Sequence, residues 1–404
     1  MKVLILSATT GGGHMTAANA MKNYILSQNK DAIIKIEDTL QYVSPFLNKA
    51  VTGGYVYMAR NTPKFYGSVY MSADKESPLN KTVEITTAIL RSKLYPLIED
   101  FSPDIIVSTH AFGAEMATSL KTKGLINIPV INIITDFAVH KVYLSEGVDS
   151  YIVSSREMVD EMVSRGVERV KVYPYGIPIK NEFFCEFDKK KCLEEEGLDP
   201  DLPTVLIMAG SFGVTDILKI YHKIVKSPAD FQVIVITGKN EKLYETFEKY
   251  LNRISMRNTL IEIKELTKPK PTNAAKLAKK KKPAKATKLM YYTNQVEKYM
   301  HMADMIVTKP GGLTVSESIA VGLPMCIFKA IPGQEAQNAD FLVSKNMAVR
   351  LEKNNTCTSI ITELINNESK LEDMRKSIKS FSKGNSAANI YLLMLELIEK
   401  YKNK

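Results

Sequence analysis

The same opening occurs twice in this chain, about two hundred residues apart, and it restricts the possible folds more than any other feature. Residues 3–7 form an apolar run that leads into a glycine-rich turn and a helical stretch over 15–26. Residues 204–208 repeat the pattern before Gly210-Ser211-Phe212-Gly213. A short apolar run before a glycine turn and a helical stretch is typical of a buried parallel strand followed by a crossover helix. The sequence therefore predicts two Rossmann-like halves.

Further apolar runs alternate with helical stretches in both halves. They cover 33–36, 105–107, 130–134 and 151–153, then 233–236, 306–307 and 325–328. This alternation is typical of parallel sheets covered by helices, and 404 residues exceed what one core usually serves. We predict an α/β protein with a first domain over 1–180, a linker over 181–203, a second domain over 204–385 and a terminal helix over 386–404. The apolar stripe of that helix predicts only that it is buried.

The positive charge of the chain is concentrated in one segment. The formal net charge is +10, but nine lysines and no acidic residue lie between Lys268 and Lys288, and the remainder is nearly neutral. Three prolines and almost no bulky apolar residue predict a disordered insertion over 268–288. Clustered lysines gain about 1 kcal/mol each near an anionic membrane, whereas the aromatic residues that stack on bases are missing. An anionic membrane surface is the expected partner, a solvated loop is the alternative, and no nucleic acid is expected.

The stretch over 309–338 indicates an anion site. Pro310-Gly311-Gly312 forms a turn after an apolar run, and a helix over 313–321 follows. The first amides of a helix have no partner inside it and attract phosphate, and two glycines leave room for a pyrophosphate. Glu317 lies one turn further on, where a carboxylate can accept from both hydroxyls of a ribose. Alternatively, Thr314 and Glu317 form a capping box.

Polar side chains at the expected ends of strands supply candidates for the chemistry. His14 follows the first glycine turn, and a helix start disfavours the imidazolium, so His14 can act as a neutral base. A helix-start polar contact is the alternative. Asp136 can orient His14 or act as the base itself. His110 can contact an acceptor or be a structural turn histidine, and His140 can contact a headgroup or sugar or be part of an exposed polar pair.

In this order, the motifs resemble the monogalactosyldiacylglycerol synthase and processive diacylglycerol glucosyltransferase family. The likeness rests on Thr10-Gly11-Gly12-Gly13-His14, Thr135-Asp136-Phe137 with His140, Gly176-Ile177-Pro178-Ile179 and the stretch over 309–338. It extends from Lys2 to about Lys383. The resemblance implies the GT-B architecture, in which two Rossmann-like domains with parallel sheets face each other across a cleft. Because ligands bind beyond the carboxyl ends of parallel strands, both glycine turns are expected at that cleft.

The resemblance also implies a role for each motif. The first domain is expected to bind the acceptor and to face the membrane, with His14 as the favoured base and Asp136 beside it. The second domain is expected to bind the UDP-sugar, and the terminal helix to pack back on the first. Acceptor contacts are expected from Gly12, Gly13, His110 and His140. Donor contacts are expected from Gly210, Ser211, Phe212, Gly213, Gly311, Gly312, Leu313, Thr314, Glu317, Gln334, Glu335 and Asn338.

The expected activity follows from this family likeness. An inverting transferase would move glucose or galactose from UDP to diacylglycerol, or onto an already glycosylated diacylglycerol, at the cytosolic face of the membrane. The alternatives are a transferase that adds GlcNAc from UDP-GlcNAc to a polyprenyl-linked peptidoglycan precursor and a UDP-sugar sensor without turnover. No apolar run has the length of a spanning helix or a signal peptide, which predicts a peripheral cytoplasmic protein. Aromatic and basic residues mixed over 45–77 suit a membrane surface or an ordinary buried helical pair.

One short motif resembles a metal site. Asp199-Pro200-Asp201 has the Asp-x-Asp form that metal-dependent transferases of another fold use to hold a divalent ion. It lies in the expected linker, has proline at its centre and follows no apolar run. We therefore expect neither a metal nor another cofactor, and we expect a helix dipole and backbone amides to hold the diphosphate instead.

Overall fold

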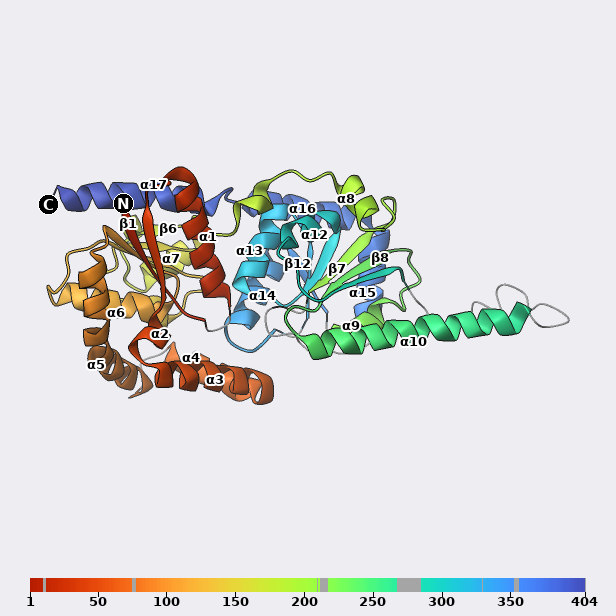
Figure 1. Ribbon diagram of the computed structural model, residues 1–404, viewed down its shortest axis with the longest axis horizontal. Helices are drawn as coiled ribbons and strands as arrows, with labels where there is room; N and C mark the ends of the chain where they lie inside the picture. Colours follow the sequence, from red (N-terminus) through yellow and green to blue (C-terminus); the bar gives the residue numbers. More distant parts are fainter. Residues whose placement is uncertain are drawn as a thin grey trace.

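Two parallel sheets form the framework of the protein, one in each half of the chain (Figure 1). The computed structural model describes residues 1–9, 12–74, 78–208, 210, 217–266, 285–328, 330–351 and 356–403. In these ranges each sheet has six strands, and every strand pair is parallel. The prediction of an α/β protein with two parallel-sheet halves is confirmed.

The first sheet has the strand order β2-β1-β3-β4-β5-β6. Its strands are β1 (Lys2–Ser7), β2 (Ile33–Asp38), β3 (Ile105–Ser108), β4 (Val130–Ile133), β5 (Ser150–Ile152) and β6 (Val172–Tyr173). Its flanking helices are α1 (Gly13–Gln28), α6 (Ala111–Thr122) and α7 (Arg156–Ser164). Between β2 and β3 the described chain is helical and forms α2 (Thr39–Val43), α3 (Pro45–Asn61), α4 (Pro63–Ala73) and α5 (Pro78–Phe101).

The second sheet has the order β12-β11-β10-β7-β8-β9. Its strands are β7 (Thr204–Met208), β8 (Gln232–Ile236), β9 (Thr287–Met290), β10 (Met305–Thr308), β11 (Met325–Ile327) and β12 (Ala348–Arg350). Its helices are α9 (Ile217–Ile224), α10 (Glu241–Leu266), α12 (Val296–Met302), α13 (Gly312–Val321), α14 (Gln334–Ser344), α15 (Thr356–Asn366) and α16 (Glu368–Phe381).

The strand orders fix where a ligand can bind. In a doubly wound sheet the crevice opens at the carboxyl ends of the two strands where the direction of winding reverses. That point lies between β1 and β3 in the first sheet and between β7 and β10 in the second. The turns after these four strands carry the glycines and histidines that the sequence singled out.

The chain crosses between the domains twice. It leaves the first domain after β6, passes the short helix α8 (Lys189–Glu195) and enters β7. It returns after α16 to α17 (Ser386–Lys402), which lies along α1 in Figure 1. Ile390, Leu393 and Met394 of α17 share a buried cluster with Val3 and Ile5 of β1. The last helix of the chain therefore completes the core of the first domain.

The predicted insertion over 268–288 needs a correction at its end. Thr287 and Lys288 belong to β9, whose residues pair with those of β8 from Val233 onward. Lys288 forms an ion pair with Glu196, and the Nζ atom of Lys285 lies 4.9 Å from the ring centre of Phe231. An edge strand tolerates lysine because one side of it remains open to solvent. The rest of the predicted insertion, up to residue 284, lies outside the described residues.

Candidate active site

His14 is held by backbone and side-chain oxygens at the crevice of the first domain. It lies in the first turn of α1, after Gly12, whose φ of 76° suits a glycine. The Nδ1 atom of His14 lies 2.7 Å from the carbonyl oxygen of Thr109 and 2.9 Å from Oγ1 of Thr135. A carbonyl oxygen only accepts hydrogen bonds, so Nδ1 carries the hydrogen. The neutral ring then has its lone pair on Nε2, the atom that can take a proton from an acceptor hydroxyl.

The surroundings keep the His14 ring neutral. Burial lowers the pKa of His14, while the nearby charge of Asp136 and the Thr109 carbonyl oppose that shift without cancelling it. The sequence had attributed the neutral ring to the helix dipole alone. Desolvation is the largest cause in the structure, and it acts in the same direction.

His110 is a neighbour of His14 and a helix cap. Its Nδ1 atom accepts a hydrogen bond of 3.3 Å from the backbone N–H of Phe112 at the start of α6. The His14 and His110 ring centres lie 4.7 Å apart, edge to face. Burial, followed by the proximity of His14, lowers the pKa of His110 to about 3. His110 is therefore a structural turn histidine, which is one of the two predicted alternatives. Its ring also packs against that of His14.

Asp136 joins the two domains. Its Oδ2 atom accepts a hydrogen bond of 2.7 Å from the hydroxyl of Tyr143, and its Oδ1 atom accepts one of 3.3 Å from Nδ2 of Asn338. The hydrogen-bond partners of His14 are Thr109 and Thr135, whereas Asp136 acts on its ring through charge. Both carboxylate oxygens of Asp136 are engaged and the side chain is buried, which favours His14 as the base.

Asn338 is completely buried and connects three segments. Besides its bond to Asp136, it accepts a hydrogen bond of 2.8 Å from the backbone N–H of Phe137 and donates one of 3.0 Å to the carbonyl of Pro310. The contact with the donor that the resemblance implied would require the amide to exchange one of these partners. In this structure Asn338 holds the turn before α13 against the loop after β4.

The amino-terminal end of α13 faces the first domain. Gly311 precedes the helix, and the first intrahelical bond runs from the N–H of Val315 to its carbonyl. The amides of Gly312, Leu313 and Thr314 therefore have no acceptor within the helix. Three amides and the positive end of the helix dipole form a binding place for phosphate.

The two glycine turns touch across the domain boundary. A Cβ atom on Gly13 would lie 3.1 Å from Cδ2 of Leu313, and one on Gly312 would lie 1.9 Å from the carbonyl oxygen of Thr135. A Cβ on Gly311 would meet nothing within 4 Å. Because Gly312 has no side chain, the backbone of the first domain at Thr135 can approach it, and that space is not available to a pyrophosphate. Of the two glycines, Gly311 alone has the open space that the sequence predicted at both.

Glu317 is half-buried in α13, with Lys180 and Glu297 as charged neighbours. Because α13 begins at Gly312, Thr314 is its third residue and not its cap, so the alternative of a capping box is wrong. Burial raises the pKa of Glu317 to about 8; Lys180 opposes this shift and Glu297 adds to it. The carboxyl group is thus largely protonated at neutral pH in this structure, and it can donate one hydrogen bond as well as accept others.

The first turn of α14 is held by α4 of the first domain. The hydroxyl of Tyr66 donates a hydrogen bond of 2.5 Å to Oε1 of Gln334, and the hydroxyl of Tyr70 donates one of 3.1 Å to Oε1 of Gln337. With its oxygen occupied, the amide of Gln334 offers its Nε2 hydrogens to a ligand. Oε2 of Glu335 accepts a hydrogen bond from the N–H of Ile331 and lies 3.7 Å from Nζ of Lys309.

His140 is buried, so the alternative of an exposed polar pair is wrong. Its Nδ1 atom accepts a hydrogen bond from the N–H of Val142, which caps the short 3₁₀ helix η1 (Lys141–Tyr143). Its Nε2 atom donates one of 2.9 Å to the carbonyl of Tyr70. Both nitrogens are engaged within the protein, so His140 fastens α4 to the first domain.

The remaining predicted site residues lie partly outside the described ranges. Gly210 follows β7 with a φ of 71°, and its carbonyl oxygen would lie 3.0 Å from a Cβ on Gly238. Its position places it beside the turn after β10, across the switch point. Ser211, Phe212 and Gly213 lie outside the described residues, as do Thr10 and Gly11.

The Asp199-Pro200-Asp201 motif lies at the end of the second sheet where β7 begins. It precedes β7, whereas the glycine turns follow the carboxyl ends of the strands. Oδ1 of Asp199 accepts a hydrogen bond from the N–H of Asp201, and Nζ of Lys190 lies 3.3 Å from Oδ1 of Asp201. These two carboxylates support a surface turn.

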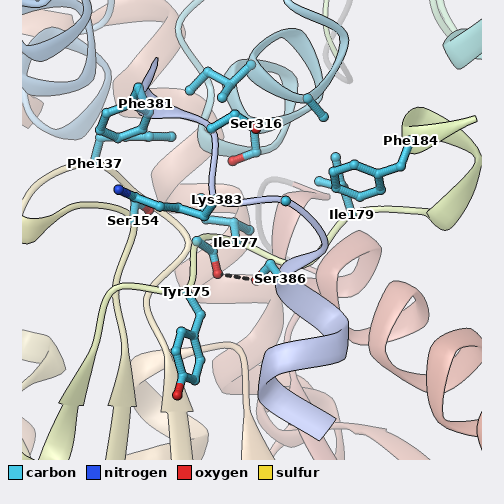
Figure 2. Close-up of a pocket in the computed structure, with 15 residues that line it drawn as sticks. Phe137, Ser154, Tyr175, Ile177, Ile179, Phe184, Ser316, Phe381, Lys383 and Ser386 are labelled. Carbon is cyan, nitrogen blue, oxygen red and sulfur yellow. Dashed lines mark hydrogen bonds between the residues drawn. The ribbon is translucent and has the colours of Figure 1, made fainter. Parts of the chain in front are cut away.

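A small cavity marks the crossing between the domains (Figure 2). It has a volume of about 40 Å³, and near it the hydroxyl of Ser386 donates a hydrogen bond of 2.6 Å to the carbonyl of Gly176. Phe137, Ile177, Ser316, Phe381 and Ser386 are among its lining residues. This volume suits about one water molecule, whereas ligand pockets usually enclose about 300–1,000 Å³. This cavity is therefore too small to hold a nucleotide.

Several residues of the site were not assigned a role from the sequence. Thr109 and Thr135 orient His14, Tyr143 binds Asp136, and Tyr66 and Tyr70 bind the first turn of α14. Thr109 directly follows β3 and Thr135 lies two residues after β4, so their places at the crevice were visible in the sequence. The tyrosines of α4 gave no such signal, because their partners lie more than 260 residues away.

Comparison with solved structures defines the class of protein. MurG from Acinetobacter baumannii is similar with a TM-score of 0.59 and 12% identity, over 98% of this chain and 99% of that chain. UDP-GlcNAc 2-epimerase from Neisseria meningitidis, solved with UDP-GlcNAc bound, is similar with a TM-score of 0.57 and 14% identity, over 98% and 100%. The fold is therefore that of the GT-B glycosyltransferases and related UDP-sugar enzymes.

Comparison of sequences then identifies the family. The family model of monogalactosyldiacylglycerol (MGDG) synthase matches residues 14–179, and that of the glycosyltransferase family 28 C-terminal domain matches residues 233–391. The first half of the chain thus matches the MGDG synthase family, and the second half matches the C-terminal domain of glycosyltransferase family 28.

Two curated relatives match over nearly their whole length. The processive diacylglycerol β-glucosyltransferase of Bacillus pumilus is 28% identical over 389 residues, which cover 96% of this chain and 93% of the relative. The enzyme of the same name from Bacillus subtilis is 26% identical over 387 residues, which cover 96% and 92%.

Proposed function

We propose that the protein transfers a hexose, glucose or its epimer galactose, from UDP to diacylglycerol with inversion at the anomeric carbon. The observation that carries this proposal is the position of His14, whose ring has Nδ1 fixed on the Thr109 carbonyl and lies at the boundary that the start of α13 faces. The names of the curated relatives support the choice of acceptor.

The proposed reaction is a single displacement. Nε2 of His14 takes the proton of the acceptor hydroxyl while its oxygen forms a bond to the anomeric carbon. The bond from that carbon to the diphosphate oxygen breaks, and the electron pair leaves with UDP. An α-linked donor then gives a β-linked product. The amides at the start of α13 and the turn at Gly210 stabilise the charge on the leaving diphosphate.

We assign the remaining donor contacts to side chains that border this place. Glu317 would bind the ribose hydroxyls, and the Nε2 group of Gln334 would bind a sugar hydroxyl, supported by Glu335. The Tyr66 bond fixes the orientation of the Gln334 amide, and fixed donors discriminate between sugars better than mobile ones. No cofactor has a step in this mechanism.

Diacylglycerol resides in a bilayer, so the enzyme must work at a membrane surface. None of the helices in the described ranges is both long and apolar enough to cross one. We propose peripheral attachment to the cytosolic face through α3 and α4, where Phe46 is 82% exposed and Phe65 is 61% exposed. The lysine-rich segment adds attraction for anionic lipids. Repeated transfer onto the first product is also proposed, from the names of the relatives alone.

A product assay tests the function directly. Purified protein is incubated with UDP-glucose or UDP-galactose and vesicles that contain diacylglycerol, and the lipids are analysed by mass spectrometry. Parallel reactions contain UDP-GlcNAc and a polyprenyl-linked peptidoglycan precursor. We expect hexosyl-diacylglycerol with one or more sugars. Product on the polyprenyl precursor alone would refute the acceptor, and UDP-sugar binding without any product would support a sensor instead.

A further inference from the structure

The outer half of α10 leaves the body of the second domain. Figure 1 shows this helix projecting to the right beyond the sheet. Leu243, Phe247 and Ile254 on its inner half are buried. From residue 255 to residue 263 the described side chains are exposed or half-buried, and Met256 is 68% exposed and Leu260 57% exposed.

These exposed apolar side chains form a stripe on one face of the helix. Met256, Leu260 and Ile263 follow the spacing i, i+4, i+7 that places residues on one side of an α-helix. A helix turns by about 100° per residue, so the stripe lies on roughly the opposite side from Leu243 and Phe247, which face the domain. Within the described residues, the stripe therefore lies on the side of α10 that faces away from the core of the second domain.

The charges around the stripe are suited to an anionic surface. Lys249, Arg253 and Arg257 line the same side of α10 as Met256 and Leu260. The sequence that follows the helix contains seven lysines between 268 and 282 and no acidic residue there. Long basic side chains beside a narrow apolar stripe are characteristic of helices that lie in the interface of a membrane.

The position of α10 agrees with the other membrane-facing elements. In Figure 1, α3 and α4 lie along the lower edge of the first domain, and α10 lies along the lower edge of the second. The helices α3 and α4, which carry the exposed Phe46, Tyr57 and Phe65, thus lie along the same edge of this view as α10. Two apolar contacts that are far apart on one edge can hold both domains against the same surface.

We infer that the outer half of α10 is a second membrane-docking element, which inserts Met256, Leu260 and Ile263 into an anionic bilayer. This inference rests on the proposed function, because that function supplies the membrane substrate. It assigns the second domain its own membrane contact, so the donor-binding domain is held at the surface independently of the acceptor-binding domain.

Vesicle partitioning of the full chain tests this inference. The double variant Met256→Ser/Leu260→Ser is compared with Leu125→Ser/Val170→Ser, which removes two exposed apolar side chains from the first domain without changing the charge. We expect the α10 variant to bind vesicles of phosphatidylcholine and phosphatidylglycerol at least about tenfold more weakly than wild type. The control variant should bind within about twofold of wild type. Equal binding of both variants would overturn the inference.

Two further measurements separate the possible outcomes. Sedimentation without vesicles shows whether wild type is a dimer that the α10 variant splits, which would make the stripe a contact between copies and refute membrane docking. Transfer to diacylglycerol dispersed in detergent should proceed at the wild-type rate in the α10 variant. If wild type itself forms no glycolipid there, the proposed function fails, whereas the vesicle measurement still decides the role of α10.

Discussion

The hydrogen bond of a single histidine nitrogen determines which atom of the site can act as a base. Thr109 fixes Nδ1 of His14 as a donor, which leaves Nε2 for the acceptor. Asparagine at this position can still donate to the Thr109 carbonyl but has no basic nitrogen. We predict that His14→Asn lowers kcat about 10²- to 10⁴-fold while the melting temperature stays near that of wild type. A variant that folds and retains full activity would exclude His14 as the base.

The pH profile of the wild-type enzyme tests the same residue independently. A base must be unprotonated, and the pKa of His14 is lowered from its usual 6.5. We therefore predict that kcat/KM stays level as the pH falls to 6.5 and declines only below it. A decline that begins above pH 7 would show that another group, or a His14 in different surroundings, controls the reaction.

Glu317 should make the stability of the protein depend on pH. Its pKa is raised from 4.5 in the unfolded chain to about 8 in the folded protein, so the folded state binds more protons between these values. Its contribution to stability is complete below about pH 4.5 and is lost as the pH rises through about 8. We predict that wild type loses stability relative to Glu317→Gln across this window. Urea denaturation at pH 5, 6, 7 and 8 measures the difference, and parallel curves would refute the raised pKa.

At the scale of elements, α4 fixes the donor turn from the other domain. Removing the hydroxyl in Tyr66→Phe releases the amide of Gln334 while the ring stays in place. Loss of one hydrogen bond of this kind costs about 0.5–1.5 kcal/mol, or about two- to tenfold in kcat/KM for the UDP-sugar. Tyr57→Phe on the exposed side of α3 is the matched control. Equal kinetics for both variants would show that the bond has no role in donor binding.

The strands at the two crevices could be predicted from the sequence, whereas the contacts between the domains could not. Apolar runs located β1, β3, β7 and β10, and the rule that ligands bind at the carboxyl ends of strands placed His14 and Gly311 at facing crevices. The strand β6 was missed because two residues give no periodic signal, and β12 was missed although β5 and β11, which are equally short, were predicted. The docking of α4 on α14 was missed because it depends on tertiary contacts between distant segments. For the same reason, the pattern could not show that His140 is buried or that Asn338 joins the domains.

For the whole molecule, the closed contact between the domains depends on one glycine. A methyl group on Gly312 would overlap the carbonyl oxygen of Thr135, whereas one on Gly311 would meet open space. We predict that Gly312→Ala destabilises the closed form by about 1–3 kcal/mol and increases the radius of gyration measured by X-ray scattering. Gly311→Ala should leave that radius unchanged. Identical scattering from the two variants would contradict the described contact.

The place of the Asp-x-Asp motif leads to a further prediction for the molecule. Asp199 and Asp201 lie before β7, at its amino-terminal end, whereas the glycine turns follow the carboxyl ends of the strands. We predict that Asp199→Asn/Asp201→Asn retains transferase activity and that excess EDTA does not abolish it in wild type. Activity that disappears with EDTA and returns with added magnesium would contradict a metal-independent mechanism.

The return of α17 to the first domain has a consequence for biosynthesis. β1 is translated long before α17, the helix that covers this strand with Ile390, Leu393 and Met394. Throughout elongation the amino-terminal sheet exposes an apolar face, and such surfaces are prone to aggregation. The first domain therefore cannot complete its core until α17 has been synthesised, and a chain terminated at residue 385 would be a target for chaperones and proteases.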